Sequence, residues 1–186
     1  MFIFIFLFKI IIDFYIIQLL LRIWMEYLYC DFYHPLSKVV YKITQPFIKL
    51  SRYITSIFML NNIYIGPIIL IYILSLIKLI LIMHIEIKFV IFKPIYLIIA
   101  LFIFLKNYGK LLFLILIIRS WFSWSNYTYN NIGILIYTLS DKLLNFIKYI
   151  SFTLINFDFS IIITMLIIYF FNFICLLFFP GIWYLI

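Results

Sequence analysis

Residues 63–83 read IYIGPIILIYILSLIKLILIM, and Lys78 is the one charged side chain among these 21 residues. A helix needs about 20 mostly apolar residues to cross the hydrocarbon core of a bilayer. Backbone polar groups find no water there, so we predict a helix in spite of the many β-branched residues. The stretch therefore predicts a membrane span, with Lys78 extending its amine toward the interface.

Three further stretches have the same character, namely residues 2–24, 94–121 and 159–179. Across the chain, 69% of residues are hydrophobic and 11% are charged, and the mean hydropathy is +1.28. A soluble domain is roughly half apolar and a quarter charged. These values exclude a soluble globular domain, a disordered chain and a disulfide scaffold. We predict an all-α membrane protein with four spans.

Residues 94–121 leave the number of spans open. A polar segment at residues 106–110, KNYGK, interrupts the apolar run, and each half alone is too short for an untilted span. One long tilted helix gives four spans in total, whereas two separate crossings, helped by residues 85–92, would give five. We favour one span, with residues 85–105 partly lying in the interface.

The connection between the first two spans is amphipathic over residues 35–54. Apolar side chains recur every three or four positions, at Leu36, Val40, Ile43, Phe47, Leu50 and Ile54. Polar side chains lie roughly 200° around the helix, at Lys38, Lys42, Gln45, Lys49 and Arg52. The pattern predicts an interfacial helix with a basic face, which Pro46 either kinks or divides into two.

The same pattern returns 96 residues later, over residues 132–150. Its apolar stripe is Ile136, Leu139, Leu143, Phe146 and Ile150, and its polar stripe is Thr138, Asp141, Asn145 and Lys148. Upstream, Arg22-Ile23-Trp24 is echoed by Arg119-Ser120-Trp121. We infer two copies of one unit (span, Arg-x-Trp, amphipathic helix, span) in residues 1–93 and 94–186. Four spans place both amphipathic helices on one side, whereas five would place them on opposite sides, as in inverted-repeat transporters.

Basic residues gather beside the amphipathic segments, while the other side offers mainly Lys88 and Lys93. The positive-inside rule therefore places these segments in the cytoplasm, and the net charge of +8 suits anionic lipid headgroups. Seven side chains are expected to contact headgroups or other membrane proteins: Arg22, Lys38, Lys42, Lys49, Arg52, Arg119 and Lys148. Arg22 and Arg119 are interpreted as interface anchors beside Trp24 and Trp121. Membrane-surface binding explains the basic stripe more simply than nucleic-acid binding, so no nucleic acid is expected.

Asp13 lies deep in the first predicted span, where a charge is costly and often functional. Lys9 precedes it by one turn and can neutralise it as an i,i+4 pair. We prefer this structural interpretation to a proton or cation relay. His34 and His84 are isolated, the two cysteines form no CxxC, and no nucleotide-binding or hydrolase motif is present. We therefore expect no metal, no cofactor and no catalytic residues.

Several motifs resemble the YggT family of integral membrane proteins, in its two-repeat bacterial form. In the first half these are LRIWM (21–25), CDFYHP (30–35), KITQP (42–46) and YILSLIK (72–78). The second half matches at Ser140-Asp141, Lys148, FDFS (157–160) and PGIW (180–183). The chain departs from the family at Lys142, where a proline is usual, and at Tyr64, where an aspartate is usual.

The resemblance implies an inner-membrane protein of unestablished biochemical activity. Relatives are associated with osmotic and ion tolerance, cell division, and cytochrome assembly and nucleoid distribution in plastids. Together with the repeated stripe, this favours a non-enzymatic membrane scaffold or assembly factor. A small ion or solute permeation protein, suggested by Asp13 and by the repeat, is the alternative, and membrane-embedded catalysis comes third.

Overall fold

The structure, a computed structural model, describes residues 2–31, 33–57, 65–86, 94–124, 131–148, 153–154 and 157–185. Its helices are α1 Phe2–Tyr27, α2 Pro35–Ile57, α3 Ile65–Glu86, α4 Ile95–Trp124, α5 Asn131–Lys148, α6 Phe159–Phe178 and α7 Pro180–Leu185. Two short strands that the sequence did not predict, β1 Thr153–Leu154 and β2 Phe157–Asp158, pair antiparallel just before α6. The predicted spans correspond to α1, α3, α4 and α6, and the predicted amphipathic segments to α2 and α5.

Three of the helices are long and apolar enough to cross a membrane: Ile65–Met83, Ile95–Trp124 and Phe159–Phe178. The helix α1 is not among them, and it carries Lys9, Asp13, Arg22 and Glu26. Its 26 residues extend about 39 Å at 1.5 Å per residue. The length of α1 is therefore sufficient for a span, whereas its charges require partners inside the protein.

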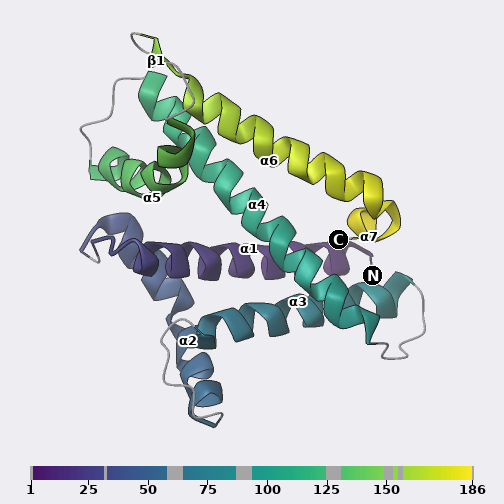
Figure 1. The fold of residues 1–186 in the computed structure, drawn as a ribbon. Coiled ribbons are helices and arrows are strands. Elements are labelled where there is room, and N and C mark those ends of the chain that lie inside the picture. Colours follow the sequence, from purple (N-terminus) through teal and green to yellow (C-terminus); the bar gives the residue numbers. More distant parts are fainter. Residues whose placement is uncertain are drawn as a thin grey trace.

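The helix α4 runs without a break from Ile95 to Trp124. It includes the polar segment KNYGK, in which Asn107 is buried on the same face as Ile103 and Leu111. The alternative of two separate helices in this region is therefore wrong. Figure 1 shows α4 passing diagonally across α1 and α3, with α6 alongside it, and α4 contacts all three of these helices.

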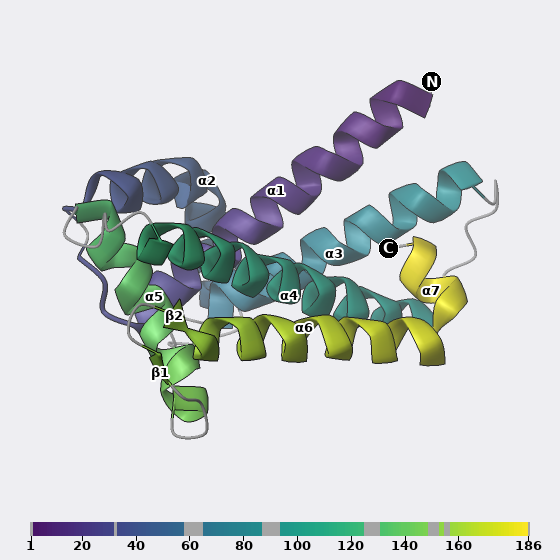
Figure 2. The same cartoon turned by 90° about the horizontal axis from the view of Figure 1, so that it is seen from above.

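Both amphipathic helices lie at the same end of the long helices. Figures 1 and 2 show α2 and α5 together at one end, and the N- and C-termini with α7 at the other. This is the arrangement expected when each amphipathic helix follows a crossing in the same direction. Seven basic residues were expected from the sequence to contact lipid headgroups or other membrane proteins. All seven therefore belong to one end of the molecule.

The buried core is centred on α1. One continuous apolar cluster contains Ile16, Leu19 and Met25 of α1 together with residues of α2, α3, α4 and α5. The helix α6 packs on α4 and α5 through a smaller cluster of Leu116, Leu144 and Ile161. The C-terminal half of the first helix is therefore packed against elements from both halves of the sequence.

The helix α2 packs on the bundle through a face beside its apolar stripe, which contributes Val40 to that face. Its buried residues are Ser37, Val40, Thr44, Ile48 and Ser51. The three hydroxyl residues are spaced seven apart, and small polar residues of this kind allow helices in membranes to approach closely. Pro46 lies inside this single helix, so the predicted division into two helices does not occur.

Candidate functional site

The side chain of Arg22 joins the end of α1 to the middle of α2. It is buried, and its Nε donates to Glu26 Oε1 at 2.9 Å, one turn further along α1. Its Nη1 donates to Thr44 Oγ1 at 3.0 Å and to Gln45 Oε1 at 3.3 Å, both on α2. The guanidinium carbon also lies 4.4 Å from the ring centroid of Tyr41. The arginine therefore holds α2 against α1 by hydrogen bonds and a cation–π contact, while Glu26 of α1 balances its charge.

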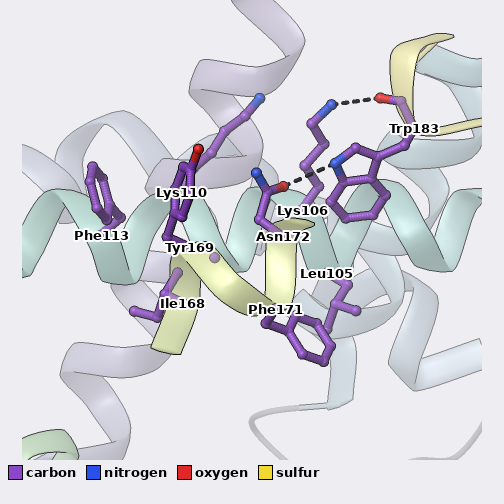
Figure 3. A pocket seen from close by; sticks show the side chains of 10 residues that line it. Leu105, Lys106, Lys110, Phe113, Ile168, Tyr169, Phe171, Asn172 and Trp183 are labelled. Atoms are coloured by element: carbon purple, nitrogen blue, oxygen red, sulfur yellow. Dashed lines mark hydrogen bonds between the residues drawn. The ribbon is translucent and has the colours of Figure 1, made fainter. Parts of the chain in front are cut away.

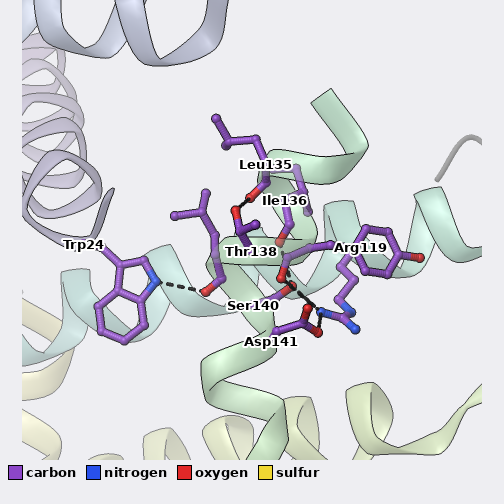
Figure 4. Close-up of polar contacts among 9 residues, drawn as sticks. Trp24, Arg119, Leu135, Ile136, Thr138, Ser140 and Asp141 are labelled. Carbon is purple, nitrogen blue, oxygen red and sulfur yellow. Dashed lines mark hydrogen bonds and ion pairs between the residues drawn. The ribbon is translucent and has the colours of Figure 1, made fainter. Parts of the chain in front are cut away.

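The side chain of Arg119 makes the equivalent connection between α4 and α5 (Figure 4). Its Nη1 donates to Ser140 Oγ at 2.6 Å and to Asp141 Oδ1 at 2.8 Å. The guanidinium carbon lies 4.4 Å from the ring centroid of Tyr137. Only 1% of Arg119 is exposed, so this charge is enclosed between the two helices and depends on Asp141 for compensation.

The two arginine sites share a hydroxyl bridge. In each, the hydroxyl that accepts from the guanidinium donates in turn to the carbonyl four residues earlier, from Thr44 to Val40 at 2.7 Å and from Ser140 to Ile136 at 2.6 Å. These hydroxyls and carbonyls are related by the same shift of 96 residues as the sequence pattern. The bridge therefore recurs at corresponding positions of the two amphipathic helices.

The carboxylate that neutralises each arginine comes from a different helix in the two sites. Glu26 lies on α1, the same helix as Arg22, whereas Asp141 lies on α5, opposite Arg119. Counted from the two arginines, which are 97 residues apart, the position corresponding to Glu26 is Ser123. Counted by the shift of 96 between the amphipathic helices, the position corresponding to Asp141 is Gln45. One carboxylate therefore accompanies each buried arginine, although the two halves place it differently.

These contacts correct the interpretation of Arg22 and Arg119 as interface anchors, because both side chains are buried between helices. By contrast, Lys38, Lys42, Lys49 and Arg52 are exposed on α2. Lys148 ends α5, but its side chain lies outside what the structure describes. The exposed cationic stripe of α2 thus consists of four side chains, and we keep the name cationic stripe for Lys38, Lys42, Lys49 and Arg52.

A seam between α1 and α5 joins the two halves of the chain. Trp24 Nε1 donates to the carbonyl of Leu139 at 3.0 Å, and Lys142 Nζ lies 4.0 Å from the ring centroid of Tyr27. The Cys30 thiol lies 3.8 Å from Thr138 Oγ1. Burial raises the pKa of this thiol, although the contact with Thr138 opposes the shift. Cys30 is therefore a protonated, weakly reactive thiol at neutral pH.

The Asp13 carboxylate lies in a second charged cluster, between α1, α3 and α4. Lys78 Nζ donates to its two oxygens at 2.7 and 2.9 Å, and Asn107 Nδ2 donates to Oδ1 at 3.1 Å. Lys110 Nζ lies 3.9 Å from Oδ2. Lys78 is only 2% exposed, so the prediction that it reaches the interface is wrong. The sequence predicts Lys9 as the partner of Asp13, whereas these contacts come from Lys78 of α3 and from Asn107 and Lys110 of α4.

Lys106 holds the short C-terminal helix α7 against α4. Its Nζ donates to the Trp183 carbonyl at 2.9 Å and lies 5.2 Å from the centroid of the Trp183 ring. The indole of Trp183 donates to Asn172 Oδ1 of α6 at 2.9 Å. A polar connection therefore runs from α4 through α7 to α6.

The described part of the chain contains no group of three or more His, Cys, Asp or Glu side chains placed to hold a metal ion. The polar residues that it does bring together are arginine, lysine, hydroxyl and amide side chains with single carboxylates. Such a set can bind anions or hold helices together, because its cations outnumber its carboxylates.

Sequence reasoning identified the arginines and the two amphipathic helices but missed their direct partners. Tyr41, Thr44, Tyr137 and Ser140 recur at a shift of 96, which is a detectable signal. The pairing of Asp13 with Lys78 left no such signal, since 65 residues separate them and only the packing of α1 on α3 brings them together.

Comparisons with known proteins identify the family of the chain. The family model CCB3/YggT matches residues 1–85. The chain is 37% identical over 168 residues to the uncharacterized protein YggT of Escherichia coli K12, an alignment covering 90% of this chain and 86% of that protein. It is 31% identical to uncharacterized proteins of Haemophilus influenzae (89% of this chain, 87% of the relative) and Vibrio alginolyticus (90% of each). No solved structure matches the chain.

The similarity to the Escherichia coli protein extends across both arginine sites, because 90% of the chain is aligned. Apolar helices long enough to span a bilayer accompany it. The chain is therefore a membrane protein that belongs to the CCB3/YggT family.

Proposed function

We propose that this protein is a non-enzymatic scaffold of the inner membrane, which presents the cationic stripe of α2 to anionic lipid and to a partner protein. In this proposal α1, α3, α4 and α6 cross the bilayer, and residues 1–93 and 94–186 are two copies of one unit. The helices α2 and α5 lie on the cytoplasmic leaflet, where the positive-inside rule favours basic residues.

The distribution of residues around α2 supports the proposal. At about 100° per residue, the buried face of Ser37, Thr44 and Ser51 lies between the two stripes, roughly 100° from each. Leu36 and Leu50 remain exposed on one side, and the cationic stripe is exposed on the other. A helix lying in the interface beside a bundle needs these three directions: toward the protein, toward hydrocarbon and toward water.

The buried arginines explain how such a surface would stay in place. Arg22 fixes α2 to α1, and Arg119 fixes α5 to α4, each through a side chain that enters the amphipathic helix near its middle. A fixed helix presents its lysines in one geometry, and side-chain ordering then costs less when a partner binds. Rigid presentation of charge suits a docking surface.

Reversing the charges of the stripe tests this proposal. In the variant K38E/K42E/K49E/R52E, we expect partner proteins captured by cross-linking in cells to fall to background, because attraction becomes repulsion. The matched variant K38R/K42R/K49R keeps the charge and should retain the partners. Membrane fractionation shows whether each variant is inserted. Unchanged partners and unchanged growth in the reversed variant would contradict the proposal.

Ion or solute permeation is a second candidate, favoured by the cluster of Asp13, Lys78 and Asn107 inside the helices. Buried ionisable groups of membrane helices often line transport pathways. Here Lys78 neutralises the Asp13 carboxylate at 2.7 Å. Because this ion pair is enough to explain the buried carboxylate, permeation is the second candidate. If permeation is the function, protein in liposomes conducts a common cation, Asp13→Asn alters that flux, and the exposed control Asp31→Asn does not. Absence of wild-type flux would remove this candidate.

A further inference from the structure

A cavity of about 250 Å³ lies between α4, α6 and α7, away from both arginine sites (Figure 3). Its polar lining comes from Lys106, Lys110, Tyr169 and Asn172, and its apolar lining includes Leu105, Phe113, Ile168 and Phe171. In Figure 3 the two lysine amines lie toward one side, while Leu105 and Phe171 lie toward the other. The cavity therefore has a cationic end and a hydrocarbon end.

The position of the cavity along the helices makes its charge unusual. Gly109 and Lys110 are the fifteenth and sixteenth of the 30 residues of α4, and Ile168 and Tyr169 are the tenth and eleventh of the 20 residues of α6. If these helices span a bilayer, the cavity lies near its midplane. Lysines at that depth face the protein interior or a polar cavity because their charge is expensive in lipid.

The cations at this level outnumber the carboxylates among the described residues. Asp13 forms its short ion pair with Lys78 and lies 3.9 Å from Lys110. The other contact of Lys110 is a 3.4 Å hydrogen bond to Asn107 Oδ1, and Lys106 is held by a carbonyl oxygen and an aromatic ring. Three lysines therefore accompany one carboxylate, and an added anion would reduce the excess positive charge.

We propose that this cavity binds the acid group of a long-chain carboxylic acid that enters from the bilayer between α4 and α6. The carboxylate would contact Lys110, with Lys106 nearby, and the chain would lie along Phe171 and Ile168. A phospholipid phosphate lies in the headgroup region, far from mid-depth, whereas the single carboxyl of a fatty acid can be carried to that depth by its own chain.

The test uses purified full-length protein in nanodiscs and a palmitic acid that carries a photoactivatable diazirine in its chain. We expect cross-links that mass spectrometry maps to α4 and α6 around the cavity. Lys110→Met should reduce labelling about tenfold or more, because a charge-assisted hydrogen bond is lost, and Lys110→Arg should retain it. The exposed control Lys142→Met, on α5 and outside the cationic stripe, should leave labelling unchanged.

A second variant fills the cavity without altering its charge. A Cβ built at Gly109 has no atom within 4 Å, so Gly109→Leu can be accommodated, and leucine favours the helix more than glycine does. We expect this variant to lose labelling. In the wild-type protein, unlabelled palmitate should compete with the probe, which tests the site even if a variant fails to fold.

Two further probes identify the chemistry of the occupant. The diazirine analogue of hexadecanol has the chain without the charge, and that of phosphatidylglycerol carries a phosphate. Labelling by the acid alone supports the proposal. Equal labelling by the alcohol, stronger labelling by the phospholipid at the same residues, or unchanged labelling of Lys110→Met would each overturn it.

Discussion

The buried arginine of each half is stabilised by one carboxylate, and the consequences of losing either partner are unequal. Asp141 is 44% exposed in its side chain, whereas Arg119 is 2% exposed. Removing the carboxylate leaves a buried cation, but removing the arginine leaves a carboxylate that water can solvate. Loss of the exposed partner, Asp141, leaves the buried charge of Arg119 uncompensated and is therefore more destabilising than loss of Arg119.

We therefore predict that Asp141→Asn lowers the free energy of unfolding by about 2–3 kcal/mol. Arg119→Met should restore at least about 1 kcal/mol when added to Asp141→Asn, since the stranded charge is then removed. Thermal unfolding in detergent micelles measures both effects. Asp31→Asn, at an exposed carboxylate, is the control. Additive destabilisation in the double variant would show that Arg119 does not depend on Asp141.

At the scale of single elements, the helices were predictable from the sequence because membrane spans and amphipathic segments follow simple periodicities. The expected range 35–54 became α2 Pro35–Ile57, and 94–121 became α4 Ile95–Trp124. The polar segment of α4 does not end that helix, because hydrocarbon offers no alternative partner for the backbone groups of a broken helix. Pro46 likewise lies inside a single helix, α2.

The packing faces of these elements were not predictable from hydropathy. The hydropathy pattern of α2 did not indicate that Ser37, Thr44 and Ser51 face the bundle, where they are buried together with Val40 of the apolar stripe. In lipid, apolar side chains gain little by facing the protein, so close contact and hydrogen bonding decide which face packs. The partner of Asp13 was missed for a related reason, since Lys78 reaches it only after α1 and α3 have packed.

At the scale of the whole molecule, α2 and α5 occupy one end and both termini the other (Figures 1 and 2). A bilayer around α3, α4 and α6 would then place both amphipathic helices in the same leaflet. This follows from α4 being one helix, because a break at residues 106–110 would have reversed every later element.

Side-specific labelling checks this orientation. In a C30S/C175S background, Lys42→Cys on α2 and Asn145→Cys on α5 are both exposed positions. We expect a membrane-impermeant maleimide to label neither cysteine in intact cells and both in inverted vesicles. A labelling pattern that differs between the two positions would contradict a shared cytoplasmic face, whereas labelling of both from outside would reverse the orientation.

The seam between Trp24 and Leu139 spans 115 residues of sequence, and this separation bears on how the protein is made. During synthesis α1 is available long before α5, so the indole N–H has no final acceptor until the second half has been inserted. A chain cut after residue 93 would keep the Arg22 contacts yet leave the Trp24 indole N–H without the Leu139 carbonyl. The packing of α1 is therefore completed in two stages, on α2 and α3 first and on α4 and α5 after the second half has been made.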